Sequence, residues 1–543
     1  MEDMFQFLFK TKSKTITLSA AILGISSTIS ALLGIVRDRL LAGTFGAGAE
    51  LDVYFAAFRI PNFVYGILIT GGLVAAFLPV FSETFEESEG EGWQLASNLL
   101  NFLVLALSAL SFLLFLFAPI VVSIIAPGFN QNQAQWTVIL TRIMMVSPIL
   151  LGLSSLLSAI LKYFDYFLTY ALAPILYNLG IIFGIIFLVP IFELKGLAYG
   201  VVLGALTHLL IQIPAAKVAG FNYRPVLNFS SEKLRRIVKL IIPRMVGQAS
   251  TQINLVVITA IASTLTAGSL AIFNFADHLQ AFPVRVIGVS FAVAAFPRFS
   301  KDLANGEKDK FLDDFSNSTR KILFAIIPIS FLTFILRGQV VRLVLGTGRF
   351  DWADTRLTAA ALGIFSFSLF ANALSHLLIR AYFSFQDTKT PVYVSIGGVV
   401  INVFLALLFV NLLSSGGLLE SGLIQLLRLE SLESIEVLAF PLAFLFSITG
   451  QLVALYYILE RRLGDLRRRE IIDSAIRILG ASLVMIIIAF LTLRAALNFT
   501  TLETFFGVFF QATVTTLVSG LTYFLAAIAF DCPEMKAILN KFL

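Results

Sequence analysis

Long apolar segments follow one another along almost the whole chain. A helix needs about 20 apolar residues to cross the hydrocarbon core of a bilayer. Only 13% of the 543 residues are charged, whereas soluble domains average about 25%. Because strands of a membrane barrel are short and alternate in polarity, the uninterrupted runs predict an all-α integral membrane protein of about 14 transmembrane helices. The predicted spans are residues 16–36, 53–81, 97–126, 138–161, 167–190, 196–216, 238–263, 270–297, 320–345, 357–384, 391–413, 437–458, 474–494 and 504–529.

Lysine and arginine are distributed unevenly between the two sides that alternating spans define. The most basic connections, residues 217–239 and 461–469, fall on the same side as the N-terminus. Cytoplasmic loops are enriched in these residues, so we expect both termini in the cytoplasm. Since the basic residues lie at the membrane edges, the sequence predicts no nucleic-acid partner. Cys532 is the only cysteine, which excludes an intramolecular disulfide and a cysteine metal cluster.

An internal repeat divides the chain. The sequence VAAFLPVFS at residues 74–82 returns as VAAFPRFS at residues 293–300. At nearly the same interval, Pro61 is matched by Pro283 and Pro174 by Pro391, and all four prolines are candidate helix kinks. The interval contains six spans, an even number, so the two copies run through the membrane in the same direction, related by an axis along its normal.

The repeat predicts three domains. The first is an N-terminal six-helix bundle at residues 1–218, and the second is a C-terminal six-helix bundle at residues 219–465. Two additional transmembrane helices follow at residues 466–543. Bundles related in this way enclose a cavity near the midplane that opens to one side at a time.

Charged residues lie within or beside several spans, although each costs about 2.5–3.5 kcal/mol there on insertion scales. Residues seven positions apart share one face of a helix. Three polar pairs have this spacing, and two aspartates adjoin them: Ser30 and Arg37, Asp52 and Arg59, His278 and Arg285, with Asp38 and Asp277. These residues are the candidate substrate-binding site.

Two interpretations of the charges stay open. In the first, arginines line a cationic cavity and Asp52 and Asp277 orient them. Arginine suits a phosphate or pyrophosphate because its planar donors bind two oxygens at once. In the second, buried arginine–aspartate pairs only lock helices together, although such pairs are weak stabilisers.

Motifs of catalysis do not stand out. The sequence has no GxxxxGK[ST], HExxH or GxSxG pattern, which are signatures of nucleotide, zinc and acyl-transfer chemistry. Asp351 and Asp354 form only a weak acidic pair in a predicted outer loop, which disfavours a membrane-embedded transferase. We therefore predict a transporter rather than an enzyme, with no catalytic residue, metal or cofactor. The alternative is a scaffold protein without activity of its own, in which the arginine–aspartate pairs are structural. Substitution of Arg59 or Arg285 would test this alternative.

Several motifs occur in a characteristic order. They are Gly34-x-x-Arg37-Asp38, Phe45-Gly46-Ala47-Gly48, Asp52-x-x-Phe55-x-Ala57-Phe58-Arg59-Ile60-Pro61-Asn62, Ala126-Pro127-Gly128-Phe129, Ala173-Pro174-x-x-x-Asn178 and Asp387-Thr388-Lys389-Thr390-Pro391. With these motifs the chain resembles the MurJ/MviN lipid II flippase family of the polysaccharide and drug exporter superfamily, over nearly its whole length.

The resemblance implies a function. Members of the family would carry the undecaprenyl-pyrophosphate-linked peptidoglycan precursor, lipid II, from the inner to the outer leaflet of the bacterial inner membrane by alternating access, for cell-wall synthesis. Carried over to this chain, Arg37, Asp38 and Asp52 would line the cavity and the arginine would contact the pyrophosphate. The last two spans would form a groove for the lipid tail. Expected partners are lipid II or a similar polyprenyl-pyrophosphate glycan, membrane lipids and cell-wall synthesis enzymes.

The chain also departs from the family pattern. Arginines expected after Ser30 and after Pro61 are Ala31 and Tyr65, and an acidic residue is missing at Thr70. In the eighth span the expected Asp-Arg pair is Asp277-His278, followed by Ala281 in place of an acidic residue. Arg285 is a candidate to replace part of this charge. Another lipid-linked oligosaccharide is therefore an alternative substrate, and a cation-coupled drug antiporter is a more distant one.

The sequence leaves open what drives transport. Membrane potential acting on cavity charges is worth about 2.3 kcal/mol per charge per 100 mV. A monovalent cation is the other candidate, since Asn402 could be a ligand, but Ala406 one turn later offers no carboxylate.

Overall fold

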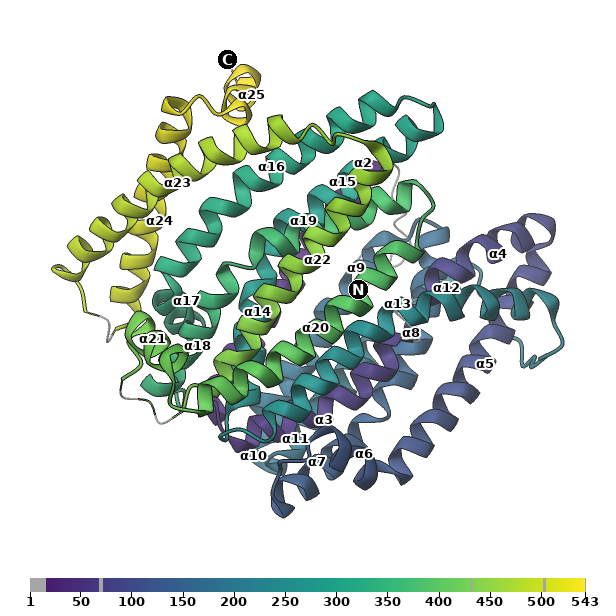
Figure 1. The fold of residues 1–543 in the computed structure, drawn as a ribbon. Helices are drawn as coiled ribbons and strands as arrows, with labels where there is room; N and C mark the ends of the chain where they lie inside the picture. Colours follow the sequence, from purple (N-terminus) through teal and green to yellow (C-terminus); the bar gives the residue numbers. More distant parts are fainter. Residues whose placement is uncertain (1–15, 68–71, 431, 433, 502–503, 543) are drawn as a thin grey trace. The chain divides into compact units, whose positions relative to one another are not determined.

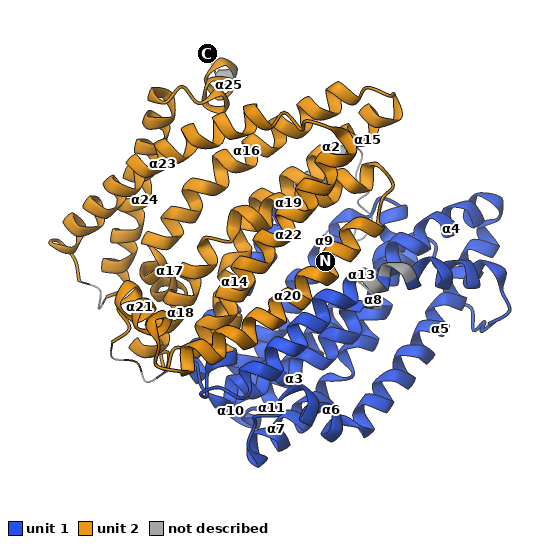
Figure 2. Cartoon of the chain, viewed as in Figure 1, with its two compact units in different colours: residues 1–270 blue, residues 271–543 orange. Residues whose placement is uncertain are grey.

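The computed structural model describes residues 16–67, 72–430, 432, 434–501 and 504–542. These residues form helices and contain no strand, as the apolar runs predict (Figure 1). Thr70, at which the family pattern has an acidic residue, lies outside the described residues. The chain forms two compact units, residues 1–270 and 271–543 (Figure 2).

Unit 1 holds the first polar pairs. Its helices are α2 (Ile16–Phe45), α3 (Ala49–Tyr65), α4 (Leu73–Glu87), α5 (Glu89–Leu116), α6 (Ala118–Ile125), α7 (Gln131–Met144), α8 (Ser147–Tyr163), α9 (Phe167–Phe183), η2 (Gly184–Leu188), α10 (Val189–Phe192), α11 (Lys195–Leu210), α12 (Gln212–Val218) and α13 (Glu232–Ala262).

Unit 2 contains the remaining helices, of which the first begins two residues before the boundary between the units. They are α14 (Ser269–Pro283), η3 (Val284–Val289), α15 (Ser290–Ala304), α16 (Lys308–Ile335), α17 (Arg337–Val344), α18 (Trp352–Ser366), α19 (Leu369–Ser384), α20 (Lys389–Ser414), α21 (Leu418–Leu427), η4 (Glu436–Leu438), α22 (Ala439–Leu463), α23 (Arg468–Leu497), α24 (Phe505–Ala529) and α25 (Pro533–Phe542).

Ten helical segments among the described residues are long and apolar enough to cross a membrane. An eleventh results when α18 and α19, which meet at a bend of 47°, are taken as one broken span. Many large apolar side chains on these helices are exposed, for example Phe112 and Val453 at 61% each. Such exposure is what a hydrocarbon surrounding requires, because lipid and apolar side chains are equally apolar.

Glycines allow α9 and α11 to approach closely in unit 1. A Cβ atom at Gly180 would collide with the backbone of Gly204, and one at Gly184 would lie 2.5 Å from the Gly200 Cα atom. Small residues at helix interfaces are the usual means of close packing in membranes. In unit 2, the neighbouring pair α20 and α22 instead shares hydrogen bonds, from Asn402 Nδ2 to Ser447 Oγ at 3.0 Å and from Gln451 to Ser395.

The connections on the predicted cytoplasmic side are held by charge. Lys233 of α13 pairs with Glu87 and Glu91 at 3.1 and 2.9 Å, and Arg236 pairs with Glu83 at 2.8 Å. The hydrogen bond to Glu91 contributes most to raising the pKa of Lys233. The acidic residues at the end of α4 and the start of α5 therefore pair with α13.

Helix α13 also packs on α3 and α6 of unit 1. The repeat would place it at the start of the second bundle, since the predicted boundary lies between residues 218 and 219. That boundary stays a prediction.

The prolines differ in their effect on the helices. Pro61 and Pro174 lie inside α3 and α9, and Pro283 ends α14 directly before the π-helical turn η3. Such a turn carries one extra residue and often occurs at functional sites. Pro391 lies in the first turn of α20, where a helix accommodates proline without a kink.

Candidate substrate-binding site

The polar residues of α2 form one network with α9. Arg37 donates to Asp38 Oδ1 from Nε at 3.0 Å and from Nη2 at 2.8 Å, distances typical of a charge-assisted pair. Its Nη1 donates to Asn178 Oδ1 at 3.3 Å. The Asn178 amide in turn donates to the Ser30 hydroxyl at 3.2 Å and to the Ser30 carbonyl at 3.3 Å. Asn178 thus connects Ser30 with the Arg37–Asp38 pair, and these three residues are all predicted site residues.

This network is largely shielded from solvent, which strengthens the electrostatic interactions of its charged groups. The Asp38 side chain is 8% exposed and the Arg37 side chain 20%. Ser30 and Arg37 lie seven residues apart on α2, about two turns or 10.5 Å along the axis. The Asn178 amide also donates to the carbonyl of Pro174, one turn earlier on α9, at 3.2 Å. Asn178 belongs to one of the family motifs but is not among the site residues predicted from the sequence.

Arg59 lies on α3 and contacts α13. Its Nε donates to Thr259 Oγ1 at 2.9 Å. Thr259 is fully buried and donates its own hydroxyl to the Leu255 carbonyl. No sequence pattern marked Thr259, because a threonine in an apolar helix usually bonds its own backbone.

Asp52 has a contact with the backbone. Its Oδ2 atom accepts a hydrogen bond from the Gly268 N–H at 2.6 Å, and the residue is 3% exposed. Gly268 has a φ of +92°, and a Cβ atom there would collide with the Ala47 carbonyl. Only glycine fits such a position without strain.

A second motif reaches the same connection between α13 and α14. The Gly128 N–H donates to Ser263 Oγ at 3.1 Å, and a Cβ atom at Gly128 would collide with the Ser263 backbone. The motifs around residues 45–52 and 126–129 therefore both pack on residues 263–268, which gives them a structural reason beyond any contact with substrate.

The polar residues of α14 are arranged more loosely. Asp277 Oδ1 accepts from Gln280 Nε2 at 3.0 Å, and His278 is half-buried. Arg285 lies in η3 and is exposed. Within the part of the chain that the structure describes, its side chain makes no hydrogen bond or ion pair, so Asp277 does not orient it. The structure brings Ser30, Arg37 and Asp38 together within unit 1 and leaves Arg285 separate from Asp277 within unit 2.

Metal binding has no evident place in this arrangement. Among the described residues, no three His, Cys, Asp or Glu side chains gather as ligands. The geometry offers instead a buried guanidinium with amide, hydroxyl and carboxylate neighbours, which can bind an anionic oxygen group.

These features define an all-helical, multi-pass membrane transporter. Solved structures with this fold include an inward-facing multidrug resistance MATE family transporter of the MOP superfamily, with a TM-score of 0.66 and 15% identity over 83% of this chain and 99% of the other. A lipid II flippase MurJ in an inward closed conformation aligns with a TM-score of 0.76 and 22% identity over 94% of this chain and 98% of the other.

The sequence comparisons identify the family. The family model described as lipid II flippase MurJ matches residues 41–513. The probable lipid II flippase MurJ of Buchnera aphidicola subsp. Acyrthosiphon pisum is 30% identical over 91% of this chain and 93% of its own length. The lipid II flippase MurJ of Burkholderia cenocepacia is 27% identical over 72% of this chain and 77% of its own. The chain belongs to the MurJ lipid II flippase family, and with at least ten apolar spans among its described residues it is a multi-pass protein of the bacterial inner membrane.

Proposed function

We propose that this chain carries lipid II from the inner to the outer leaflet by alternating access, for peptidoglycan synthesis. The single observation that supports this most strongly is the match of the family model over residues 41–513. Relatives named as lipid II flippases align over most of their own length, and solved transporters with inward-facing and outward-facing conformations share the fold.

The proposed architecture has fourteen spans in two parallel-related bundles of six, followed by two further helices. The ten or eleven described segments that are long and apolar enough to cross a membrane account for most of these spans. The others would be α2, the α3–α4 region and α13. Both termini would lie in the cytoplasm, where the basic residues of α13 and of residues 461–469 would face anionic lipids and the enzymes that make the precursor.

The proposed binding site places the pyrophosphate at Arg37. Its guanidinium is already oriented by Asp38 and Asn178, so little side-chain entropy is lost when an anionic oxygen binds. Ser30, Asp38, Asp52 and Arg59 are the other candidate residues within unit 1, and Asp277, His278 and Arg285 are the candidates within unit 2. The groove for the lipid tail would lie on α23 and α24.

Coupling to the membrane potential is the driving force we favour. The Asn402 side chain is buried and its amide donates to Ser447 at 3.0 Å. Its Oδ1 atom has no hydrogen-bond partner among the described residues, but neighbouring Ala406 supplies no carboxylate to complete a cation site.

Rescue of a bacterium depleted of its own lipid II flippase tests the function. The wild-type chain should restore growth and cell shape, and an Arg37→Ala variant at equal membrane abundance should not. Arg142→Ala is the matched control, because Arg142 is on α7 and donates to the Phe115 carbonyl at an exposed position. A well-folded wild type that fails to rescue would point to another lipid-linked glycan, with the replaced arginines at Ala31 and Tyr65 as the first positions to restore.

A further inference from the structure

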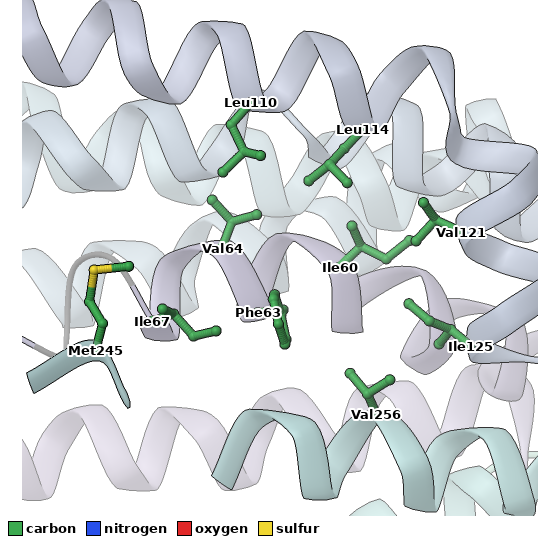
Figure 3. Close-up of a pocket in the computed structure, with 10 residues that line it drawn as sticks. All are labelled: Ile60, Phe63, Val64, Ile67, Leu110, Leu114, Val121, Ile125, Met245 and Val256. Atoms are coloured by element: carbon green, nitrogen blue, oxygen red, sulfur yellow. The ribbon is translucent and has the colours of Figure 1, made fainter. Parts of the chain in front are cut away.

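A cavity of about 400 Å³ lies inside unit 1, between α3, α5, α6 and α13 (Figure 3). Every residue that lines it is apolar, and Ile60, Phe63 and Val64 of α3 form its centre. Leu114 of α5 faces them, and Val256 and Met245 of α13 lie on the other side of α3. An apolar cavity favours hydrocarbon over water or a polar solute.

The cavity adjoins a charged group. Arg59 precedes Ile60 on α3, and residues 59 and 63 share one side of the helix. Thr259, the hydrogen-bond partner of Arg59, lies one turn after Val256 on α13. The Arg59–Thr259 hydrogen bond therefore bridges α3 and α13 at the edge of the apolar cavity, so that a cation and a hydrocarbon site lie next to each other.

The depth of Arg59 indicates which lipid could use both features. Arg59 is six residues from the start of the predicted span at residues 53–81, which is about 9 Å at 1.5 Å per residue and well inside a hydrocarbon core that is about 30 Å thick. A resident phospholipid keeps its phosphate at the membrane surface. Only a lipid in transit carries its anionic group to this depth.

We propose that this cavity holds the isoprenoid units next to the pyrophosphate of the lipid in transit at the stage when the pyrophosphate passes Arg59, before or after it lies at Arg37. The proposal rests on the flippase function and adds a hydrocarbon subsite in unit 1. The volume is at the low end of small-molecule sites, which range over about 300–1,000 Å³, so the cavity takes a segment of the chain and not the whole.

Photolabelling of the full-length protein in vesicles tests this subsite. The probe is undecaprenyl pyrophosphate with a diazirine in the isoprenoid units nearest the pyrophosphate, and the comparison probe is phosphatidylglycerol with a diazirine in one acyl chain. The pyrophosphate probe should label residues 60–67 of the α3 region and residues 110–114 of α5, and unlabelled undecaprenyl pyrophosphate should compete. Equal labelling by the phospholipid probe, or labelling only elsewhere, would overturn the proposal.

Two adjacent leucines provide a matched pair of variants. Leu114→Trp fills the cavity and should lower labelling about tenfold, equivalent to about 1.4 kcal/mol. Leu113→Trp, on the outward face of α5 where Leu113 is 51% exposed, should leave labelling within about twofold. Leu114→Phe is a smaller filling change that serves if the Trp variant does not fold. Unchanged labelling in a folded filling variant would contradict the subsite.

Rescue of flippase-depleted cells, run in parallel, separates this proposal from the function itself. If the wild type rescues growth but the cavity is not labelled, the proposed subsite is wrong and the proposed flippase function stands. Labelling without rescue would keep a polyprenyl-pyrophosphate subsite and reject lipid II transport.

Discussion

The two units hold their intramembrane charges in different ways. In unit 1, Arg37 is fixed by Asp38 and Asn178, and Arg59 by Thr259. In unit 2, Arg285 is exposed and its side chain has no hydrogen bond among the described residues. Unit 1 thus presents arginine donors that are already oriented, whereas no described side chain orients Arg285 of unit 2.

Helix packing shows a parallel contrast. In unit 1, α9 and the following turn η2 approach α11 through Gly180, Gly184, Gly200 and Gly204. In unit 2, α20 and α22 are joined by hydrogen bonds of Asn402 and Gln451. Close backbone contact leaves no tolerance for an added methyl group, whereas an interhelical hydrogen bond in a membrane contributes only about 0.6–2 kcal/mol. The α9–α11 contact is therefore the less tolerant of a larger side chain.

Arg37→Ala should have the largest effect. It leaves the carboxylate of Asp38 buried without its partner, which typically costs about 3–5 kcal/mol. Thermal unfolding in detergent should show the loss of stability, and rescue of flippase-depleted cells should fail. The double variant Arg37→Ala/Asp38→Ala should regain most of the stability and still fail to rescue. Restored growth in the double variant would mean that the pair only holds helices together.

Gly180→Ala should be the next most damaging. The added methyl group would collide with the Gly204 backbone, and overpacking of this kind costs about 1–3 kcal/mol. The matched change in unit 2 is Gly397→Ala, since no heavy atom lies within 4 Å of a Cβ atom there. Unfolding temperatures should fall for the first variant and stay unchanged for the second. Equal decreases in unfolding temperature for the two variants would contradict the difference in packing between Gly180 and Gly397.

Asn178→Ala should cost about 1 kcal/mol, the usual net value of a hydrogen-bonded side chain. It removes the acceptor of Arg37 and the donor to Ser30, so Arg37 loses one of its two side-chain partners. We expect slower lipid translocation with a modest decrease in unfolding temperature. Unaltered translocation would show that the Asp38 contact alone orients the arginine.

Asp387→Asn should act through pH. The Asp387 carboxylate accepts from the backbone N–H groups of Lys389 and Thr390 and pairs with Arg462 at 3.1 Å. Burial favours its neutral form, but the hydrogen bonds from Thr390 and the charge of Arg462 outweigh burial and lower its pKa.

The lowered pKa of Asp387 determines how the stability of the protein depends on pH. Stability from Asp387 is present above the unfolded pKa of about 3.9 and is lost as the pH falls through the folded value. Asn keeps a hydrogen-bond acceptor but loses the charge that faces Arg462 and the helix N-terminus, so the variant should be less stable than the wild type by up to about 1 kcal/mol at pH 7, and the difference should vanish in acid. A difference that persists in acid would contradict this origin.

Arg285→Ala should have the smallest effect on stability, within about 0.5 kcal/mol, as for other exposed positions. Translocation should nevertheless fall if Arg285 replaces part of the charge missing at His278. Normal translocation by the folded variant would limit the cationic site to the arginines of unit 1.

Much of this arrangement could be predicted from the sequence. Uninterrupted apolar runs require helices in a membrane, and the described residues form helices joined by connecting segments, with no strand. The seven-residue spacing of Ser30 and Arg37 correctly placed them on one side of α2, where both contact Asn178.

What the sequence could not supply were partners from other helices. Asn178 is 141 residues from Arg37, and Thr259 is 200 residues from Arg59. Helical periodicity describes one face of one helix and contains no information on the neighbour that packs against it. The contact of Asp52 with the Gly268 N–H had no signal either, because any residue but proline can offer a backbone donor.

The most direct test of the central claim is the rate at which lipid II crosses the membrane of vesicles that contain the purified chain. The account predicts translocation by the wild type and by Arg142→Ala, and none above protein-free vesicles by the folded Arg37→Ala/Asp38→Ala variant. Translocation by that double variant at the wild-type rate would contradict the assignment of the α2–α9 network as the site that receives the pyrophosphate.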